Sequence, residues 1–366
     1  MLYVLLRLVR TRWTAVAVYR SDIWGRLLRY SQYSPATPTE TLEADVEATA
    51  PETTEPIALV RNTYSLKKAS IEINKPRAGS PGPVELGFPT LTGEQEEQLI
   101  NDFITSLDAD AICNLAASYN HGKPCKVLRN TSGSFNVCFF IKFDDDDDDG
   151  KVVVRIPIEP VVARPWEKVV SEVATIQYLQ QKTSIPVPRI RGHGRGAKLM
   201  KDSSATQVYV VADLVEGDML DKKLLIEGQE EHRKGFYSEL IDILAELRKL
   251  EFPSIGSLLP NPDGGPHPIP SLPNLKSAKA YMKGQWRFVS DFFSPPVRDE
   301  DLDDSRAEIM ALHHMEPIFD QFIDPPLDGG PFVLHHMDLR SPNIIVDKFL
   351  RIEDVIDWEF ALTQQT

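Results

Sequence analysis

Long uncharged hydrophobic runs, an excess of basic residues and a set of paired cysteines are all missing from this chain. No uncharged stretch approaches the roughly 18 residues that a membrane span requires, so we expect no transmembrane segment. The 40 Lys and Arg residues face 54 Asp and Glu residues, and the net charge of -14 argues against nucleic-acid binding through a basic surface. The three cysteines, Cys113, Cys125 and Cys138, lack metal-ligand spacing and are typical of reduced thiols in an intracellular protein.

The composition changes twice before the main part of the chain begins. Residues 1–34 are rich in arginine and contain Asp22 as their one acidic residue, which fits a mitochondrial presequence or an incidental extension. Residues 35–90 are acidic at first and then rich in proline, so we expect a disordered linker. The remaining residues are numerous enough to bury a core and to form two lobes. We expect a cytoplasmic protein, with the mitochondrion as the alternative location.

Four polar residues stand at a distinctive spacing near the end of the chain, namely His336, Asp338, Asn343 and Asp357. The first three lie in a loop between two short apolar runs, and Asp357 ends a further apolar run. A carboxylate in such a loop can accept the proton of a hydroxyl, and an amide oxygen with a second carboxylate can hold magnesium on phosphate groups. The spacing is that of the catalytic loop and metal-binding aspartate of kinases. The pattern therefore favours phosphoryl transfer.

The same residues fit two other interpretations. His336-Met-Asp338 is also the first half of a non-haem iron site, but that site needs a second histidine downstream and none follows His336. A polar turn between two buried strands is the simpler alternative. Two further segments are not interpreted as metal sites, because Asp144–Asp149 cannot converge on one ion and His313 and His314 would point about 100° apart on a helix.

Residues 126–160 are predicted to form a meander of strands, with strands at 137–143 and 152–156. The turn Ser132-Gly133-Ser134 could donate backbone N–H groups to nucleotide phosphates, although a single glycine in a hairpin is more often only a turn. Arg155 is a candidate contact for the phosphates. The helix expected at 166–181 projects Glu172 from its inner side, where it would pair with Arg155. A solvent-facing Arg155 and a solvated Glu172 are the alternatives.

Hydrophobic periodicity predicts the remaining elements. A helix is expected from residue 94 to 107, a strand at 207–214, a long helix from 236 to 250, and helical segments at 276–292 and 301–323. Six prolines and Gly264-Gly265 predict an irregular loop at 259–274.

The sequence Asp338-Leu-Arg-Ser-Pro-Asn-Ile-Ile-Val346, together with Val355-Ile-Asp-Trp-Glu-Phe360, resembles the aminoglycoside phosphotransferase-like family, which includes choline kinase-like enzymes, and in particular its fungal members. The resemblance extends over about residues 91–366. It implies an α+β, protein kinase-like fold with two lobes. Residues 91–215 would be an antiparallel sheet with one helix that binds ATP, and residues 216–366 a mainly helical catalytic lobe.

The resemblance also implies ATP and Mg2+ as cofactors and a role for each candidate residue. Asp338 would be the base for a hydroxyl of a small-molecule acceptor, His336 would buttress the loop, and Arg340 would stabilise developing charge. Asn343 and Asp357 would hold the Mg2+. The remaining roles concern the nucleotide: phosphate contacts from Ser132, Gly133, Ser134 and Arg155, support of Arg155 by Glu172, and backbone bonds to the adenine from Asp213 and Val215.

The chain ends at Thr366, soon after Asp357, whereas the fold of the family continues with further helices. We therefore expect a C-terminally shortened lobe whose exposed apolar surface invites a protein partner. Two functions stay open at this point. One is an ATP-dependent phosphotransferase that acts on an unidentified small-molecule hydroxyl, and the other is a catalytically inactive nucleotide-binding or scaffold protein.

Overall fold

The computed structural model describes residues 93–144, 150–201, 203–265, 267–293, 310 and 325–364. Several expectations lie outside the described residues: the leader at 1–34, the linker at 35–90, most of the aspartate run, the pair His313-His314 and, apart from residue 310, the helix at 301–323.

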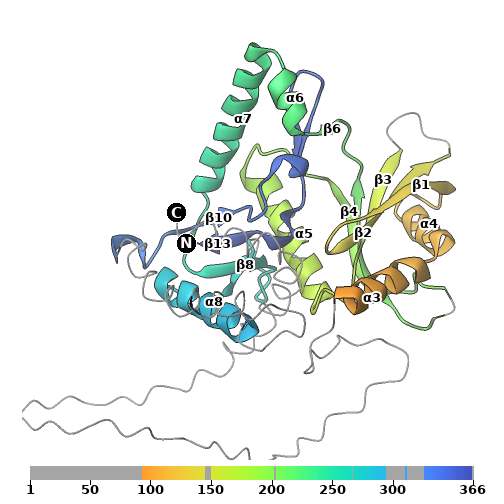
Figure 1. Ribbon diagram of the computed structural model, residues 1–366, viewed down its shortest axis with the longest axis horizontal. Coiled ribbons are helices and arrows are strands. Elements are labelled where there is room, and N and C mark those ends of the chain that lie inside the picture. Colours follow the sequence, from red (N-terminus) through yellow and green to blue (C-terminus); the bar gives the residue numbers. More distant parts are fainter. Residues whose placement is uncertain are drawn as a thin grey trace, which may run out of the picture.

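A five-stranded antiparallel sheet forms the first lobe, with the strand order β1-β2-β3-β5-β4. Its strands are β1 (Cys125–Ser132), β2 (Asn136–Phe143), β3 (Lys151–Pro157), β4 (Ile190–Ala197) and β5 (Gln207–Asp213). Its helices are α3 (Gly93–Ser106), α4 (Ala109–Ser118) and α5 (Pro165–Lys182). The sheet lies between α3 and α4 on one side and α5 on the other (Figure 1). The predicted antiparallel sheet with its helix is confirmed.

The two faces of this sheet have different partners because strand side chains alternate. Val137 and Phe139 of β2 are buried against α3 and α4. Cys138, between them in the sequence, faces the opposite way. Cys138 pairs with Arg155 of β3, and Arg155 pairs with Val210 of β5, so these three side chains share a face. Val210 packs against α5. Arg155 therefore lies on the face of the sheet that is turned toward α5.

The edge strand β4 was not predicted, because its sequence alternates glycine mainly with polar residues. A Cβ atom at Gly192 would lie 2.1 Å from Cε1 of Tyr119, and one at Gly194 would lie 2.5 Å from the hydroxyl oxygen of Tyr209. The two tyrosine hydroxyls are 2.9 Å apart. Glycine is thus required where two aromatic rings lie directly against the strand.

The second lobe contains two further antiparallel sheets among its described residues. One has the order β7 (Glu251–Phe252), β10 (Phe332–His335), β13 (Leu362–Gln364), β8 (Ile255–Leu259) and β9 (Ile269–Leu272). The other consists of β12 (Ile352–Val355), β11 (Ile344–Val346) and β6 (Asp218–Met219). The helices are α6 (Lys222–Glu227), α7 (Glu230–Arg248) and α8 (Ala278–Phe293). The α+β class is confirmed, and in the described part of this lobe the helices hold more residues than the short strands do.

The hairpin of β8 and β9 overlaps the segment 259–274, which was predicted to be irregular. Pro270 is tolerated because β9 is an edge strand, where one side of the backbone needs no ladder partner. Gly256 of β8 has a φ of 148°, and a Cβ atom there would lie 2.6 Å from the backbone nitrogen of Ser271. The prolines and glycines of this segment therefore belong to a closely paired hairpin as well as to its loop.

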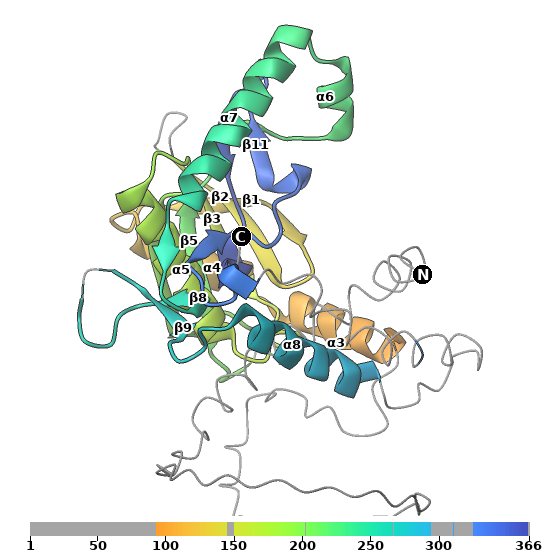
Figure 2. The same ribbon diagram turned by 90° about the vertical axis from the view of Figure 1, so that its left-hand side faces the viewer.

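A shared core joins the two lobes and fixes the elements that surround the candidate site. Ile176 and Leu179 of α5 pack with residues of α7, β10 and β12 and with Trp358 of the short helix η3 (Trp358–Phe360). Phe236 of α7 packs on Ile344 of β11. Helix α6, which precedes α7 in the chain, lies beside the end of α7 that is far from the sheets (Figure 1, Figure 2). None of the described helices combines the length and the apolar character that crossing a bilayer takes.

Candidate active site

The loop between β10 and β11 brings Asp338 and Asn343 into contact. The side-chain Nδ2 of Asn343, in the short helix η2 (Ser341–Asn343), donates to the backbone oxygen of Asp338 at 2.8 Å and to its Oδ2 at 3.1 Å. Arg340 donates from Nε to the same Oδ2 at 3.0 Å. Two donors thus hold one carboxylate oxygen of Asp338, and the carboxylate is 24% exposed, so it is fixed in direction and accessible.

His336 ties this loop to the strand that precedes Asp357. Its Nδ1 accepts from the Asp338 N–H at 3.2 Å, so its Nε2 carries the proton that is donated to the Ile356 oxygen at 2.9 Å. Together the two bonds require the neutral ring, because Nδ1 accepts only when it carries no proton. Burial lowers the pKa of His336, and the Ile356 carbonyl, Asp357 and Asp338 offset this only in part. His336, whose ring also lies 4.5 Å from that of Trp358, therefore positions the loop without carrying charge.

Asp357 follows β12 in an unusual backbone conformation. Its φ of 71° and ψ of 50° lie in the left-handed region, which Asp tolerates better than most residues. The turn is held by the Ile356 N–H, which donates to the Asn343 oxygen at 2.9 Å. As a result, the Asp357 carboxylate is turned toward Arg155, whose Nη2 lies 2.8 Å from Oδ1.

Arg155 is the centre of a cluster of three carboxylates. Its Nη1 donates to Glu172 of α5, and its Nη2 donates to Asp357 and, at 3.2 Å, to Oε2 of Glu359. Burial alone would lower the pKa of Arg155, but these three carboxylates outweigh it and hold the pKa well above its ordinary value. Arg155 and Glu172 thus form the ion pair that their positions predicted, and Glu172 is a buried residue.

Sequence reasoning gave no role to Glu359, Lys168 or Asn136, which complete the cluster. Oε2 of Glu359 accepts from Lys168 and from Nδ2 of Asn136 at 2.6 Å, and Lys168 also donates to Oδ1 of Asn136 at 2.9 Å. The position of Lys168, one helical turn before Glu172 on α5, is the signal that could have found it. Three carboxylates against the cations of Arg155 and Lys168 leave the cluster formally negative.

The proposed phosphate-binding turn is an exposed hairpin between β1 and β2. The N–H of Gly133 donates to the Asn136 oxygen at 2.9 Å within the turn, whereas Ser132 and Ser134 are exposed at its tip. In the same hairpin, the guanidinium carbon of Arg129 on β1 stands 3.8 Å over the ring centre of Phe140, its ladder partner on β2.

The connection after β5 carries Asp213 and Val215. The Asp213 carboxylate pairs with Arg191 of β4, so this side chain anchors the edge of the sheet. Val215 lies just before Gly217, which has a φ of 127°, and a Cβ atom on Gly217 would lie 2.8 Å from Cγ2 of Ile345. The connection is therefore pressed against β11.

The donor groups fit magnesium better than a metal held by the protein alone. In the described part of the chain, no group of three His, Cys, Asp or Glu side chains could hold a metal. Because Nδ2 of Asn343 is bonded to Asp338, its Oδ1 is the atom left to face a cation. An amide oxygen and the Asp357 carboxylate are hard ligands, and Mg2+ commonly binds one or two such groups together with phosphates and water.

Known proteins are similar to this chain over a region that includes the residues described above. The model of the phosphotransferase enzyme family matches residues 139–364. Clavilactone A biosynthesis cluster protein Y of Ampulloclitocybe clavipes is 26% identical over 237 residues, which cover 59% of this chain and 57% of the relative. Altered inheritance of mitochondria protein 9, mitochondrial, of Komagataella phaffii is 31% identical over 96 residues, which cover 25% of this chain and 15% of the relative. The chain thus spans little more than half of the first relative and a small part of the second.

Among solved structures, the ADP-bound aminoglycoside phosphotransferase APH(2'')-Ib is similar to this chain with a TM-score of 0.45 and 15% identity, over 70% of this chain and 72% of that one.

Proposed function

This chain belongs to the phosphotransferase enzyme family, and on that premise we propose that it transfers the γ-phosphoryl group of ATP to a hydroxyl of a small molecule. The observation that carries the proposal is the junction of the two loops. Asn343 bonds Asp338 at 3.1 Å through its side chain, and it bonds the residue before Asp357 through its backbone. A catalytically inactive scaffold would not need Asp338, Asn343 and Asp357 in these relative positions. Their arrangement therefore favours an enzyme over the inactive alternative.

Asp338 is the proposed base. Its Oδ2 is held by Asn343 and Arg340, so Oδ1 would face the acceptor hydroxyl. Oδ1 would take the proton of this hydroxyl as its oxygen forms a bond to the γ-phosphorus, the bond from that phosphorus to the β,γ-bridging oxygen breaks, and ADP leaves. Arg340, bonded to that carboxylate at 3.0 Å, would stabilise negative charge on the transferred group. His336 would keep the loop in register through its two bonds.

Asn343 and Asp357 would hold the magnesium that, when bound, neutralises the charge of the phosphates. Asp357 now accepts from Arg155 at 2.8 Å, so it would exchange this cation for the metal. Arg155 would keep Glu172 and Glu359 as partners, and the N–H of Nη2 that Asp357 releases would face the phosphates. The negative charge of the cluster favours such an exchange with a divalent cation.

The nucleotide would lie between the first sheet and β11. Val153 and Ala212 are partners in the ladder on the Arg155 face and would cover the adenine, whose edge would meet the backbone of Asp213 and Val215. The turn Ser132-Gly133-Ser134 would close over the phosphates. Since the Gly133 N–H is used inside the turn, Ser132 and Ser134 are the better donors.

The location of the protein is part of the proposal. We place it in the cytoplasm, and the alternative is the mitochondrion, which the name of one relative mentions and which the arginine-rich residues 1–34 would suit. Microscopy of the full chain with a C-terminal fluorescent tag decides between them, because the tag leaves the N-terminal segment free.

Transfer of labelled phosphate tests the function. The full chain is incubated with γ-labelled ATP, Mg2+ and a panel of amino alcohols, sugars and choline, with Asp338→Asn as the test and Glu353→Gln, exposed on β12, as the matched control. We expect Asp338→Asn to retain nucleotide binding and to lose about 100- to 10,000-fold in rate. If Asp338→Asn transfers phosphate as fast as the unchanged chain, Asp338 is not the base. If the unchanged chain neither hydrolyses ATP nor transfers phosphate, the inactive scaffold is the remaining interpretation.

A further inference from the structure

A buried polar link joins the two lobes beside the proposed metal ligand Asp357. Glu359 lies on η3, two residues after Asp357. Its Oε2 accepts from Asn136 at 2.6 Å and from Lys168, and Lys168 also donates to Oδ1 of Asn136 at 2.9 Å. Asn136 begins β2 and Lys168 lies on α5, so both belong to the first lobe. The three side chains thus form a closed triangle of hydrogen bonds across the boundary between the lobes.

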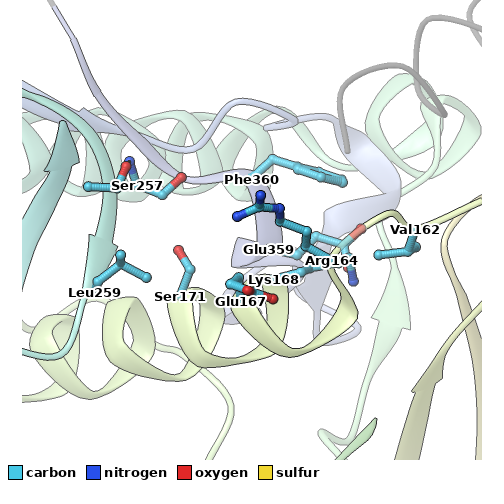
Figure 3. A pocket seen from close by; sticks show the side chains of 10 residues that line it. Val162, Arg164, Glu167, Lys168, Ser171, Ser257, Leu259, Glu359 and Phe360 are labelled. Atoms are coloured by element: carbon cyan, nitrogen blue, oxygen red, sulfur yellow. The ribbon is translucent and has the colours of Figure 1, made fainter. Parts of the chain in front are cut away.

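An aromatic contact lies beside this link. The ring centres of Phe135 and Phe360 are 4.9 Å apart, and the rings meet edge to face, an arrangement that aromatic pairs prefer. The Lys168 ammonium lies 5.9 Å from the centre of the Phe360 ring. Figure 3 shows Lys168, Glu359 and Phe360 next to one another. Two successive residues of the hairpin between β1 and β2 therefore contact two successive residues of η3.

The polar link is buried and reaches the turn of the hairpin. Asn136 and Glu359 are 8% and 5% exposed, and the side chain of Lys168 is 6% exposed. Hydrogen bonds to charged groups are strong in such surroundings, because little water competes for the same atoms. The backbone oxygen of Asn136 also accepts from the Gly133 N–H at 2.9 Å. The position of Asn136 therefore helps to set that of the turn proposed to close over the phosphates.

We propose that Asn136, Lys168 and Glu359 form a clasp that holds the hairpin of β1 and β2 over the nucleotide phosphates after the metal has bound, an inference that rests on the proposed function. Another bond between the lobes joins Arg155 to Asp357 at 2.8 Å. Magnesium at Asp357 would remove this bond, whereas the clasp contains neither proposed metal ligand and would persist. The clasp and the bond from Arg155 to Glu359 would then keep the hairpin in place beside the metal. The three residues of the clasp are thus positioning residues.

Asn136→Leu is the variant that tests the clasp. Leucine has the branching of asparagine but no polar atoms, so this change removes both side-chain bonds of Asn136 and leaves Glu359 with both of its cations. Glu359→Gln is less suitable, because removing the carboxylate partner of buried cations destabilises the fold itself. Asn130→Leu, at an exposed position of β1 in the same hairpin, is the matched control.

Hydrogen exchange of the full chain without nucleotide tests whether the clasp holds the hairpin. Two amides report on it: Gly133, which donates to the Asn136 oxygen at 2.9 Å, and Ile158, which donates to the Phe135 oxygen at 2.8 Å. We expect both to exchange about tenfold faster in Asn136→Leu, because the loss of a bond to a charged group populates the open hairpin. Exchange in Asn130→Leu should equal that of the unchanged chain. Unchanged exchange in Asn136→Leu, or equal acceleration in both variants, overturns the clasp.

Calorimetry with ATP tests the positioning role. With Mg2+ we expect Asn136→Leu to raise the Kd of ATP about tenfold and Asn130→Leu to leave it unchanged. Without Mg2+ the bond between Arg155 and Asp357 still joins the lobes, so Asn136→Leu should change the weaker Kd much less. A merely structural Asn136 would change both Kd values by the same factor or neither, and that result overturns the positioning role. If the unchanged chain does not bind ATP at all, the proposed function fails and the positioning role with it, whereas the exchange rates still decide whether the clasp exists.

Discussion

Asp354 offers a stability prediction whose size follows from its surroundings. It lies on β12 opposite Ile345 of β11, it is 5% exposed, and its Oδ1 has no hydrogen-bond partner in the described part of the chain. Burial raises the pKa of Asp354 to about 8, against a smaller lowering by a hydrogen bond with the backbone of Val355. The protonated form is therefore the one that the fold accommodates.

The direction of the pH dependence follows from the two pKa values. In the unfolded chain the carboxyl ionises near its ordinary pKa of 3.8, so between that pH and about 8 the unfolded chain has lost the proton that the folded protein retains. The free energy of unfolding is thus unaffected below about pH 4, falls as the pH rises toward about 8, and then stays constant. At about 1.4 kcal/mol for each pH unit, the loss at pH 7 is at most about 4 kcal/mol.

Asp354→Asn removes the ionisation and nearly keeps the shape. We expect this variant to gain about 1–4 kcal/mol over the unchanged protein at neutral pH and little or nothing near pH 4. Urea unfolding at a series of pH values, followed by tryptophan fluorescence, measures the difference. Glu353→Gln, exposed on the same strand, is the matched control and should show no such trend. A gain that does not grow with pH, or an equal gain in Glu353→Gln, would refute the reasoning.

Three further substitutions test the site, the first sheet and helix α8. Glu172→Gln removes one carboxylate from Arg155, and we expect calorimetry to show a Kd of Mg-ATP that is about tenfold higher. This factor corresponds to the loss of one charge-assisted hydrogen bond of about 1.5 kcal/mol. An unchanged Kd would contradict the role of the pair. Gly192→Ala should destabilise by about 1–3 kcal/mol in urea unfolding, because its Cβ would meet the Tyr119 ring at 2.1 Å. Gly284→Ala in α8 has open space and should stabilise by up to about 1 kcal/mol, so equal signs for the two glycines would contradict the packing.

The loop that carries Asp338 and Asn343 and the strands beside it could be predicted because they depend on local patterns. Short apolar runs on either side of Asp338 and Asn343 indicate strands joined by a polar loop, and the structure has β10 and β11 there. The ion pair of Arg155 with Glu172 followed from a strand position and a helix face. These inferences need only the periodicity of one element at a time.

Features that depend on residues far apart in the chain could not be predicted from the sequence. Strand β4 has no hydrophobic alternation, since its glycines accommodate tyrosine rings from other elements. Strand β9 contains Pro270, which is acceptable only because the sheet ends there. The bonds of Glu359 with Lys168 and Asn136 join three segments, and although the helical spacing of Lys168 and Glu172 points to Lys168, it does not indicate Glu359 or Asn136 as its partners. Tertiary context decided each of these cases.

Calorimetry of ATP binding with and without Mg2+, on the unchanged chain and on Asp357→Asn, tests the central claim most directly. The account predicts that ATP binds tightly only with Mg2+, and that Asp357→Asn loses the part of the affinity that depends on the metal. ATP binding that ignores Mg2+, or that depends on it equally in Asp357→Asn, would contradict the account.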